Sequence, residues 1–199
     1  AASDVYKRQD INHLKKNNIT LLITATSNAL AVAEHVMYMM LSLSKGVTLY
    51  DSEVRSGNFK KNANKIETYE LYKKEILIAG FGRIGKNLIK RCLGFDMKAN
   101  VFDPFIDEST IKSYGGNKVD NLQTAIKTSD FVSIHMPLND KTRNLIDAKI
   151  LKTMKSNAII INTARGGIIN EVDLDNALKS KIIYAAGLDV FEKEPPDSN

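Results

Sequence analysis

Short apolar runs alternate with amphipathic stretches along most of this chain of 199 residues. A short apolar run between polar residues is typical of a buried strand, and apolar positions three or four apart are typical of a helix. This pattern predicts strands at residues 19–24, 76–79, 99–102, 131–135, 158–162 and 185–188. It predicts helices over residues 28–43, 83–93, 121–127, 148–154 and 171–179. Residues 10–18 are predicted to be the end of a helix and the loop that follows it. Alternating strands and helices predict an α/β fold with a doubly wound parallel sheet.

The longest helix, over residues 28–43, is apolar on nearly every face. A helix of this kind is expected between two layers of protein. It is therefore either a core helix or part of a contact between domains or subunits, and both interpretations stay open. Residues 57–74 are mostly polar, which predicts an exposed connection into the strand at 76–79.

Gly80, Gly82 and Gly85 follow that strand with the spacing of a dinucleotide-binding turn. The first glycine permits a tight turn, the second lets the backbone approach a pyrophosphate, and the third lets the next helix pack on the sheet. That helix begins near Arg83, and its N-terminal N–H groups and positive dipole end favour bound phosphates. Gly94 is expected to end the helix. The turn thus predicts a dinucleotide site.

Asp103 follows the strand at 99–102, where a carboxylate can accept hydrogen bonds from both hydroxyls of an adenosine ribose. A 2′-phosphate would be repelled by this carboxylate. The next residues, Pro104 and Phe105, supply no cation to hold such a phosphate. The predicted cofactor is therefore NAD rather than NADP.

Composition narrows the classes of partner. The net charge of +5 is spread over lysine-rich segments without interleaved aromatic residues, which argues against a nucleic-acid partner. Cys92 is the only cysteine, and the three histidines lie far apart, so neither an internal disulfide nor a metal site is predicted. The apolar stretch 29–43 contains Glu34 and His35 and is too short to span a bilayer, so no membrane association is expected.

Residues 1–9 have no periodicity and resemble translated adapter sequence, so we expect a non-native leader there. Because the first residue is not methionine, targeting cannot be judged from the sequence, and a cytoplasmic location is the default expectation.

Ligands of a doubly wound sheet bind beyond the carboxyl ends of the strands, so the residues after each strand are candidates for a site. Met136 and Pro137 come after the strand at 131–135, and Thr142 follows shortly, beside the expected position of a cofactor ribose. His135 is interpreted as a packed or supporting histidine rather than a catalytic one.

Two further strand ends carry charged residues. Arg165 stands beside two glycines, so its planar guanidinium can approach a small ligand and bind a carboxylate. Asp189 and Glu194 place two carboxylates after the last strand. Acids are common in turns, so each of the two acids alone is more typical of an ordinary loop than of a site, and an ordinary exposed loop arginine is the alternative for Arg165.

Taken together, these motifs closely resemble the NAD-binding domain of the D-isomer-specific 2-hydroxyacid dehydrogenases. The segments that carry the resemblance are 28–34, 80–103, 135–144, 162–173 and 186–196. The resemblance implies a Rossmann-type domain over 28–199 that is truncated at its C-terminal side. It also implies that residues 10–27 are a remnant of the substrate domain.

The resemblance implies roles for individual residues. Arg165 would bind and polarise the carboxylate and carbonyl of a 2-oxo acid, and Glu194 would pair with a catalytic histidine and raise its pKa. Asp189 would contact the nicotinamide end of the cofactor. The other implied cofactor-binding residues are Gly80, Gly82, Arg83, Ile84, Gly85, Asp103, Met136, Pro137, Thr142, Thr163 and Ala164.

The implied activity is hydride transfer between NAD(H) and a D-2-hydroxy or 2-oxo acid, with 3-phosphoglycerate as one candidate, in a protein that is a homodimer when complete. The family's catalytic histidine would lie after Asn199, so the chain alone is expected to be inactive and to bind NAD weakly. One alternative is a non-catalytic, NAD-sensing corepressor of the same family. Another is a different Rossmann enzyme, such as a methyltransferase, which would have no use for Arg165 and Glu194.

Overall fold

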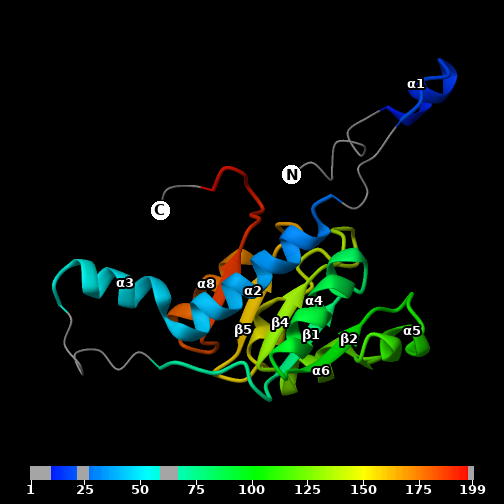
Figure 1. Cartoon of the computed structure of the whole chain (residues 1–199). Coiled ribbons are helices and arrows are strands. Elements are labelled where there is room, and N and C mark those ends of the chain that lie inside the picture. Colours follow the sequence, from blue (N-terminus) through cyan, green and yellow to red (C-terminus); the bar gives the residue numbers. More distant parts are fainter. Residues whose placement is uncertain (1–9, 22–26, 59–66, 197–199) are drawn as a thin grey trace.

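The computed structural model describes residues 10–21, 27–58 and 67–196. Within these ranges the core is a parallel six-stranded sheet in the order β3-β2-β1-β4-β5-β6 (Figure 1). The strands are β1 (Glu75–Ala79), β2 (Lys98–Phe102), β3 (Asn117–Lys118), β4 (Phe131–Ile134), β5 (Ile159–Asn162) and β6 (Ala185–Leu188). This is the strand order of a Rossmann-type sheet, so the predicted fold class is confirmed.

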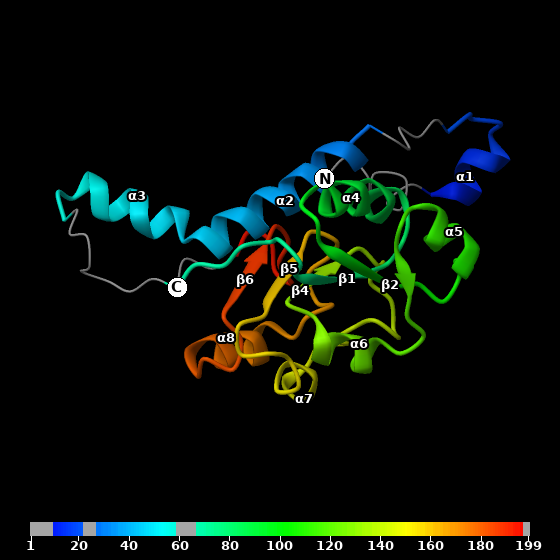
Figure 2. The same ribbon diagram turned by 60° about the horizontal axis from the view of Figure 1, so that its bottom comes forward.

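Helices cover both faces of the sheet (Figure 2). In the first half of the chain the helices in the described ranges are α1 (Ile11–Lys16), α2 (Ala29–Lys45), α3 (Val47–Arg55) and α4 (Arg83–Gly94). In the second half they are α5 (Glu108–Ser113), α6 (Leu122–Thr128), α7 (Ala148–Leu151) and α8 (Glu171–Lys179).

The pleat of β1 explains the two cores. Ile76 and Ile78 pack with α2, α4 and α5, whereas Leu77 and Ala79 pack with α6, α7 and α8. Because successive side chains of a strand point to opposite faces, a strand buried on both sides needs a continuous apolar run. This run is what made the central strands visible in the sequence.

The structure corrects or extends some local expectations. Residues 19–21 are exposed and not in a strand, and 22–26 lie outside the described residues, so no strand at 19–24 is supported. The helix α4 includes Gly94, and the left-handed residue after it is Asp96, with φ 54°. The helices α3 and α5 and the short strand β3 were not anticipated, because α3 buries none of its side chains and α5 and β3 are short and mostly polar.

Helix α2 buries one side and leaves another exposed. Ala33, Val36 and Met40 are fully buried against the sheet and α4, whereas Leu30 and Tyr38 are 49% and 62% exposed. An ion pair of 3.0 Å between Arg91 and Glu34 joins α4 to α2 at the surface. Among the helices in the described ranges, none has the length and apolar character needed to cross a membrane.

Candidate functional site

The site residues that the sequence predicted follow the carboxyl ends of the strands, and Arg83, Ile84 and Gly85 among them lie in the first turn of α4. The strand β1 sits between β2 and β4, so the connections leaving β1 and β4 run to opposite sides. This reversal opens the crevice in which ligands of doubly wound sheets bind.

The turn after β1 is tight because two backbone segments approach it closely. Gly80 has φ 103°, and a Cβ at this position would lie 2.7 Å from the carbonyl carbon and oxygen of His135. A Cβ on Gly85 would lie 2.5 Å from the carbonyl oxygen of Gly80. Only glycine fits at either place, so the turn is held against β4 and α4 is held against the turn.

Gly82 differs from Gly80 and Gly85, the other two glycines of the turn. A Cβ built there would have no described atom within 4 Å, and φ is −73°, which any residue can adopt. The absence of a side chain at Gly82 is therefore not required by packing. Helix α4 begins directly after it, without a side-chain hydrogen bond at the cap. The first N–H groups and the positive end of α4 thus face open space, where an anion is favoured.

Asp103 ties the end of β2 to the glycine turn. One carboxylate oxygen accepts a hydrogen bond of 2.8 Å from the N–H of Phe81, and the other accepts one of 2.9 Å from the N–H of Phe105. Each oxygen keeps a further lone pair for a ribose hydroxyl. The carboxylate therefore both fixes the turn and remains able to bind a sugar.

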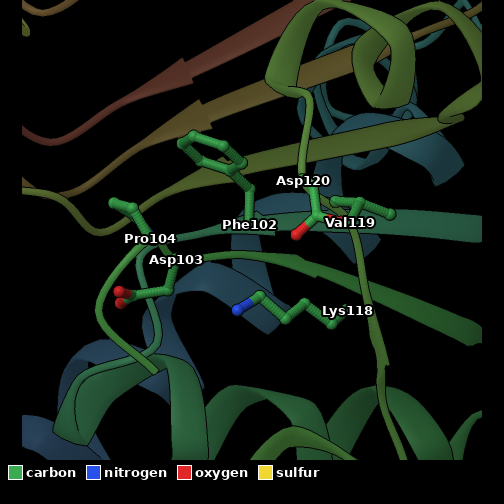
Figure 3. Close-up of a pocket in the computed structure, with 6 residues that line it drawn as sticks. All are labelled: Phe102, Asp103, Pro104, Lys118, Val119 and Asp120. Atoms are coloured by element: carbon green, nitrogen blue, oxygen red, sulfur yellow. The ribbon is translucent and has the colours of Figure 1, made fainter. Parts of the chain in front are cut away.

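A pocket of about 280 Å³ opens beside Asp103 (Figure 3). It is lined by Phe102, Asp103, Pro104, Lys118, Val119 and Asp120. The ammonium of Lys118 donates a hydrogen bond of 2.9 Å to the carbonyl oxygen of Ile106. No cation was expected near Asp103, because the residues that follow it in the chain, Pro104 and Phe105, carry none. Lys118 reaches the pocket from β3, a strand of two residues that carries no sequence signal.

The loop after β4 contains Met136, Pro137 and Thr142. The Thr142 hydroxyl donates a hydrogen bond of 2.7 Å to the carbonyl oxygen of Pro137 and accepts one of 2.8 Å from the N–H of Asn139. Thr142 therefore closes this loop. Met136 packs against the core on the side of α6 and α8.

The turn after β5 is held by Asn162, which the sequence analysis did not single out. Its side chain accepts a hydrogen bond of 3.0 Å from the N–H of Ala164 and donates one of 2.9 Å to the carbonyl oxygen of Arg165. Asn162 is 2% exposed, so these two bonds are shielded from water. The half-buried Arg165 also donates to the carbonyl oxygen of Ala164. The backbone that carries the guanidinium is thus fixed.

The segment after β6 lies directly against the Arg165 turn. A Cβ on Gly166 would collide with the backbone of Phe191 and Glu192, so these two segments touch main chain to main chain. The carboxylate of Glu194 accepts a hydrogen bond of 3.1 Å from the N–H of Phe191. Asp189 lies 3.6 Å from the ring of His35 on α2. The acids after β6 and the arginine after β5 therefore share one end of the sheet.

Two buried polar atoms at this edge have no hydrogen-bond partner. They are the hydroxyl oxygen of Thr163 and Nδ1 of His135. The register of β4 and β5 pairs Ile134 with Asn162. His135 and Thr163 come directly after these paired residues on the two adjacent strands. An unsatisfied buried polar group costs free energy unless a ligand or water satisfies it.

Burial favours the neutral form of the His135 ring. Its Nε2 lies 2.8 Å from the hydroxyl of Ser133, and burial lowers the pKa of the ring to about 4. A proton on this ring would place a charge where water reaches it poorly. The interpretation of His135 as a packed histidine agrees with this geometry.

The low pKa of His135 gives stability a dependence on pH. Between about pH 6.5 and about pH 4 the unfolded chain binds a proton at this residue that the folded chain does not. The free energy of unfolding is therefore not reduced by this residue above pH 6.5. It decreases as the pH falls toward 4, by at most roughly 1.4 kcal/mol per pH unit. We expect His135→Gln to flatten the slope of the free energy of unfolding, measured by urea denaturation across this range.

A matched control for this measurement is His13→Gln, because His13 is exposed on α1. That variant should keep the wild-type slope. An unchanged slope in His135→Gln would show that the acid sensitivity arises elsewhere.

The residues at this edge fit a bound dinucleotide. The open space at Gly82 and the uncapped start of α4 suit a pyrophosphate, Asp103 suits a ribose, and the unpartnered hydroxyl of Thr163 offers a hydrogen-bond partner. Within the described ranges, no three or more His, Cys, Asp or Glu side chains are grouped to hold a metal ion.

Comparison with known proteins gives a consistent result. Residues 37–199 match the family described as D-isomer specific 2-hydroxyacid dehydrogenase, NAD binding domain. D-3-phosphoglycerate dehydrogenase of Methanocaldococcus jannaschii is 36% identical over 190 residues, which cover 96% of this chain and 36% of that protein. Hydroxypyruvate reductase of Thermotoga maritima is 38% identical over 187 residues, which cover 94% of this chain and 59% of that protein.

Solved structures agree with these relatives. D-lactate dehydrogenase of Lactobacillus jensenii, solved with NAD⁺, superimposes with a TM-score of 0.84 at 28% identity, covering 94% of this chain and 56% of that one. The chain thus spans between about a third and three fifths of the length of these similar proteins.

Proposed function

The chain belongs to the D-isomer specific 2-hydroxyacid dehydrogenase family, as its NAD-binding domain, and we propose that the protein carrying it transfers hydride between NAD(H) and a D-2-hydroxy or 2-oxo acid. The observation that carries this proposal is the placement of Arg165, fixed by Asn162, at the same edge of the sheet as the glycine turn. A cofactor in the crevice and a carboxylate on Arg165 would thus meet at one end of the sheet.

Named residues would hold the cofactor along this edge. The N–H groups at the start of α4, including those of Arg83 and Ile84, would face the pyrophosphate, and Asp103 would bind the adenosine ribose. Thr163, Ala164 and Asp189 would lie along the nicotinamide side. When bound, NAD supplies the hydride acceptor of the oxidation, and NADH supplies the donor of the reduction.

Arg165 would bind the acid substrate. A guanidinium presents parallel N–H donors that match the two oxygens of a carboxylate, and one of its donors can also polarise the adjacent carbonyl. The hydrogen bonds of Asn162 hold the backbone of this residue in place before substrate arrives. Such preorganisation lowers the cost of binding.

Glu194 would act on a histidine supplied by the rest of the protein. Reduction of a carbonyl needs a proton as well as a hydride, and a carboxylate beside a histidine raises the pKa of the imidazole toward neutrality. The bond from the N–H of Phe191 keeps the carboxylate of Glu194 at the edge of the sheet.

The proposal extends to the identity of the 2-oxo acid substrate. Relatives of the chain are named for phosphoglycerate, hydroxypyruvate and glyoxylate, and we propose phosphohydroxypyruvate, the oxo partner of 3-phosphoglycerate, as a candidate to test with the other two. Protein from the complete reading frame should oxidise NADH with one of these 2-oxo acids. Saturable NADH binding without turnover would contradict the enzyme and favour a cofactor-sensing corepressor.

Arg165→Lys in the same protein is expected to raise the KM for the oxo acid roughly tenfold, because the planar fork is lost while the charge stays. The KM for NADH should change little. The matched control is Arg143→Lys, whose guanidinium lies 3.5 Å from Glu192 at the exposed surface. An equal rise in the oxo-acid KM for both variants would contradict the role of Arg165.

We also propose that the complete protein is a cytoplasmic homodimer. Support for the dimer comes from α2 and α3, which expose large apolar side chains. These are Leu30, Tyr38, Val47, Leu49, Tyr50 and Val54. Exposed apolar groups gathered on adjacent helices are typical of a protein contact. Sedimentation of the complete protein as a monomer would contradict this part of the proposal.

A further inference from the structure

We propose that Lys118 is a second determinant of cofactor choice, and that this pocket accepts a 2′-phosphorylated dinucleotide once Asp103 carries no charge. The inference rests on the NAD site described above and adds a residue to it. It follows from the position of Lys118 in the pocket rather than from its place in the sequence.

Lys118 and Asp103 face the same space. Lys118 comes from β3 and Asp103 from the end of β2, and both line the pocket of about 280 Å³. Figure 3 shows the lysine side chain extended toward the side of Asp103 and Pro104. The hydrogen bond to the carbonyl oxygen of Ile106 uses one of its donors. An ammonium has three donors, so two N–H bonds remain available to a ligand.

Two carboxylate residues line the same pocket. They are Asp103 and Asp120, so two negative charges stand against one positive charge. Glu108 on α5 lies nearby, and its pKa is lowered mainly by Lys112 and to a smaller extent by Lys118. Glu108 has its own partner, because its carboxylate lies 2.7 Å from the Lys112 ammonium. Removing the charge of Asp103 would therefore leave one carboxylate and one ammonium lining the pocket.

The charges in the pocket explain how Asp103 and Lys118 would together distinguish NAD from a 2′-phosphorylated dinucleotide. Asp103 accepts the ribose hydroxyls of NAD and repels a 2′-phosphate, which carries the same sign of charge. Lys118 attracts that phosphate, but in the native pocket its charge is outweighed. Serine at position 103 is shorter than aspartate and uncharged, so the phosphate would find both room and a cation.

The test compares dissociation constants for NADH and NADPH by fluorescence titration, in protein from the complete reading frame. In Asp103→Ser we expect NADPH to bind at least about tenfold tighter than in wild type, and NADH to bind more weakly. Adding Lys118→Met should remove the gain for NADPH, whereas adding Lys118→Arg should keep it. A double variant with Lys118→Met that binds NADPH as tightly as Asp103→Ser alone would overturn the inference.

A second pair of variants guards against misfolding, since Asp103→Ser also removes the bonds to Phe81 and Phe105. In the background with Asp103 intact, Lys118→Met should raise the ratio of the NADPH to the NADH dissociation constant severalfold, and Lys118→Arg should not. Equal ratios in all three proteins would overturn the inference. Wild-type protein that fails to bind NADH would instead contradict the proposed function itself.

Discussion

Gly80→Ala is expected to lower the free energy of unfolding by roughly 2 to 5 kcal/mol. The backbone at this position has φ 103°, which strains any residue with a Cβ. The added methyl would also lie 2.7 Å from the backbone of His135, which cannot rotate away as a side chain could. The two costs add, because relieving the contact would require moving β4. Urea denaturation of the purified chain measures the loss.

The matched control is Gly94→Ala. Gly94 lies in the last turn of α4, and a Cβ there meets no described atom within 4 Å. Alanine is the better helix former, so this variant should be neutral or slightly more stable, by up to about 1 kcal/mol. Similar losses for both glycines would show that β4 does not constrain the turn.

Gly82→Ala is expected to leave stability near the wild-type value while weakening NADH binding at least about a hundredfold. The backbone angles at Gly82 suit alanine, and the methyl enters open space in front of α4. That same space is where the pyrophosphate would approach the main chain. Binding and stability should therefore separate at this residue, whereas Gly80→Ala should reduce both. A destabilised Gly82→Ala protein would contradict the open geometry.

The parts of the site that could be predicted from sequence are those in which a local pattern and a structural need coincide. The run at 76–79 and the glycines after it form one continuous segment, so their spacing revealed strand, turn and helix together. The charged residues after β5 and β6 were visible because each follows an apolar run. Their common placement depends only on the parallel direction of the strands.

Other parts depend on contacts between distant segments. Lys118 enters the pocket from a strand of two residues, and its partner Ile106 lies twelve residues away in the chain. Asn162 stands at the end of an apolar strand and gave no sign that its amide would bond to Ala164 and Arg165. The strand predicted at 19–24 is wrong at residues 19–21, which are exposed and not in a strand although Ile19 and Thr20 are β-branched, and residues 22–24 lie outside the described residues.

The proposed function assigns the chemistry to the edge of the sheet rather than to its core. Relatives with 36% and 38% identity to the chain bear the names of different 2-hydroxyacid enzymes. Different substrates among relatives of one chain are expected, because one fold can carry different binding sites. The proposed reaction of a 2-hydroxy or 2-oxo acid needs both Arg165 and Glu194. The main-chain contact at Gly166 brings the segments of these two residues side by side.

The most direct test of the central claim is the effect of NADH on the backbone amide signals of the isotope-labelled chain in solution NMR. This measurement detects weak binding and identifies the residues involved. We expect saturable shifts concentrated in residues 80–85 and at Asp103, retained in Gly94→Ala and absent in Gly82→Ala. Shifts of equal size in Gly82→Ala, or no shifts within residues 80–85 of the wild-type chain, would contradict a dinucleotide site at this turn.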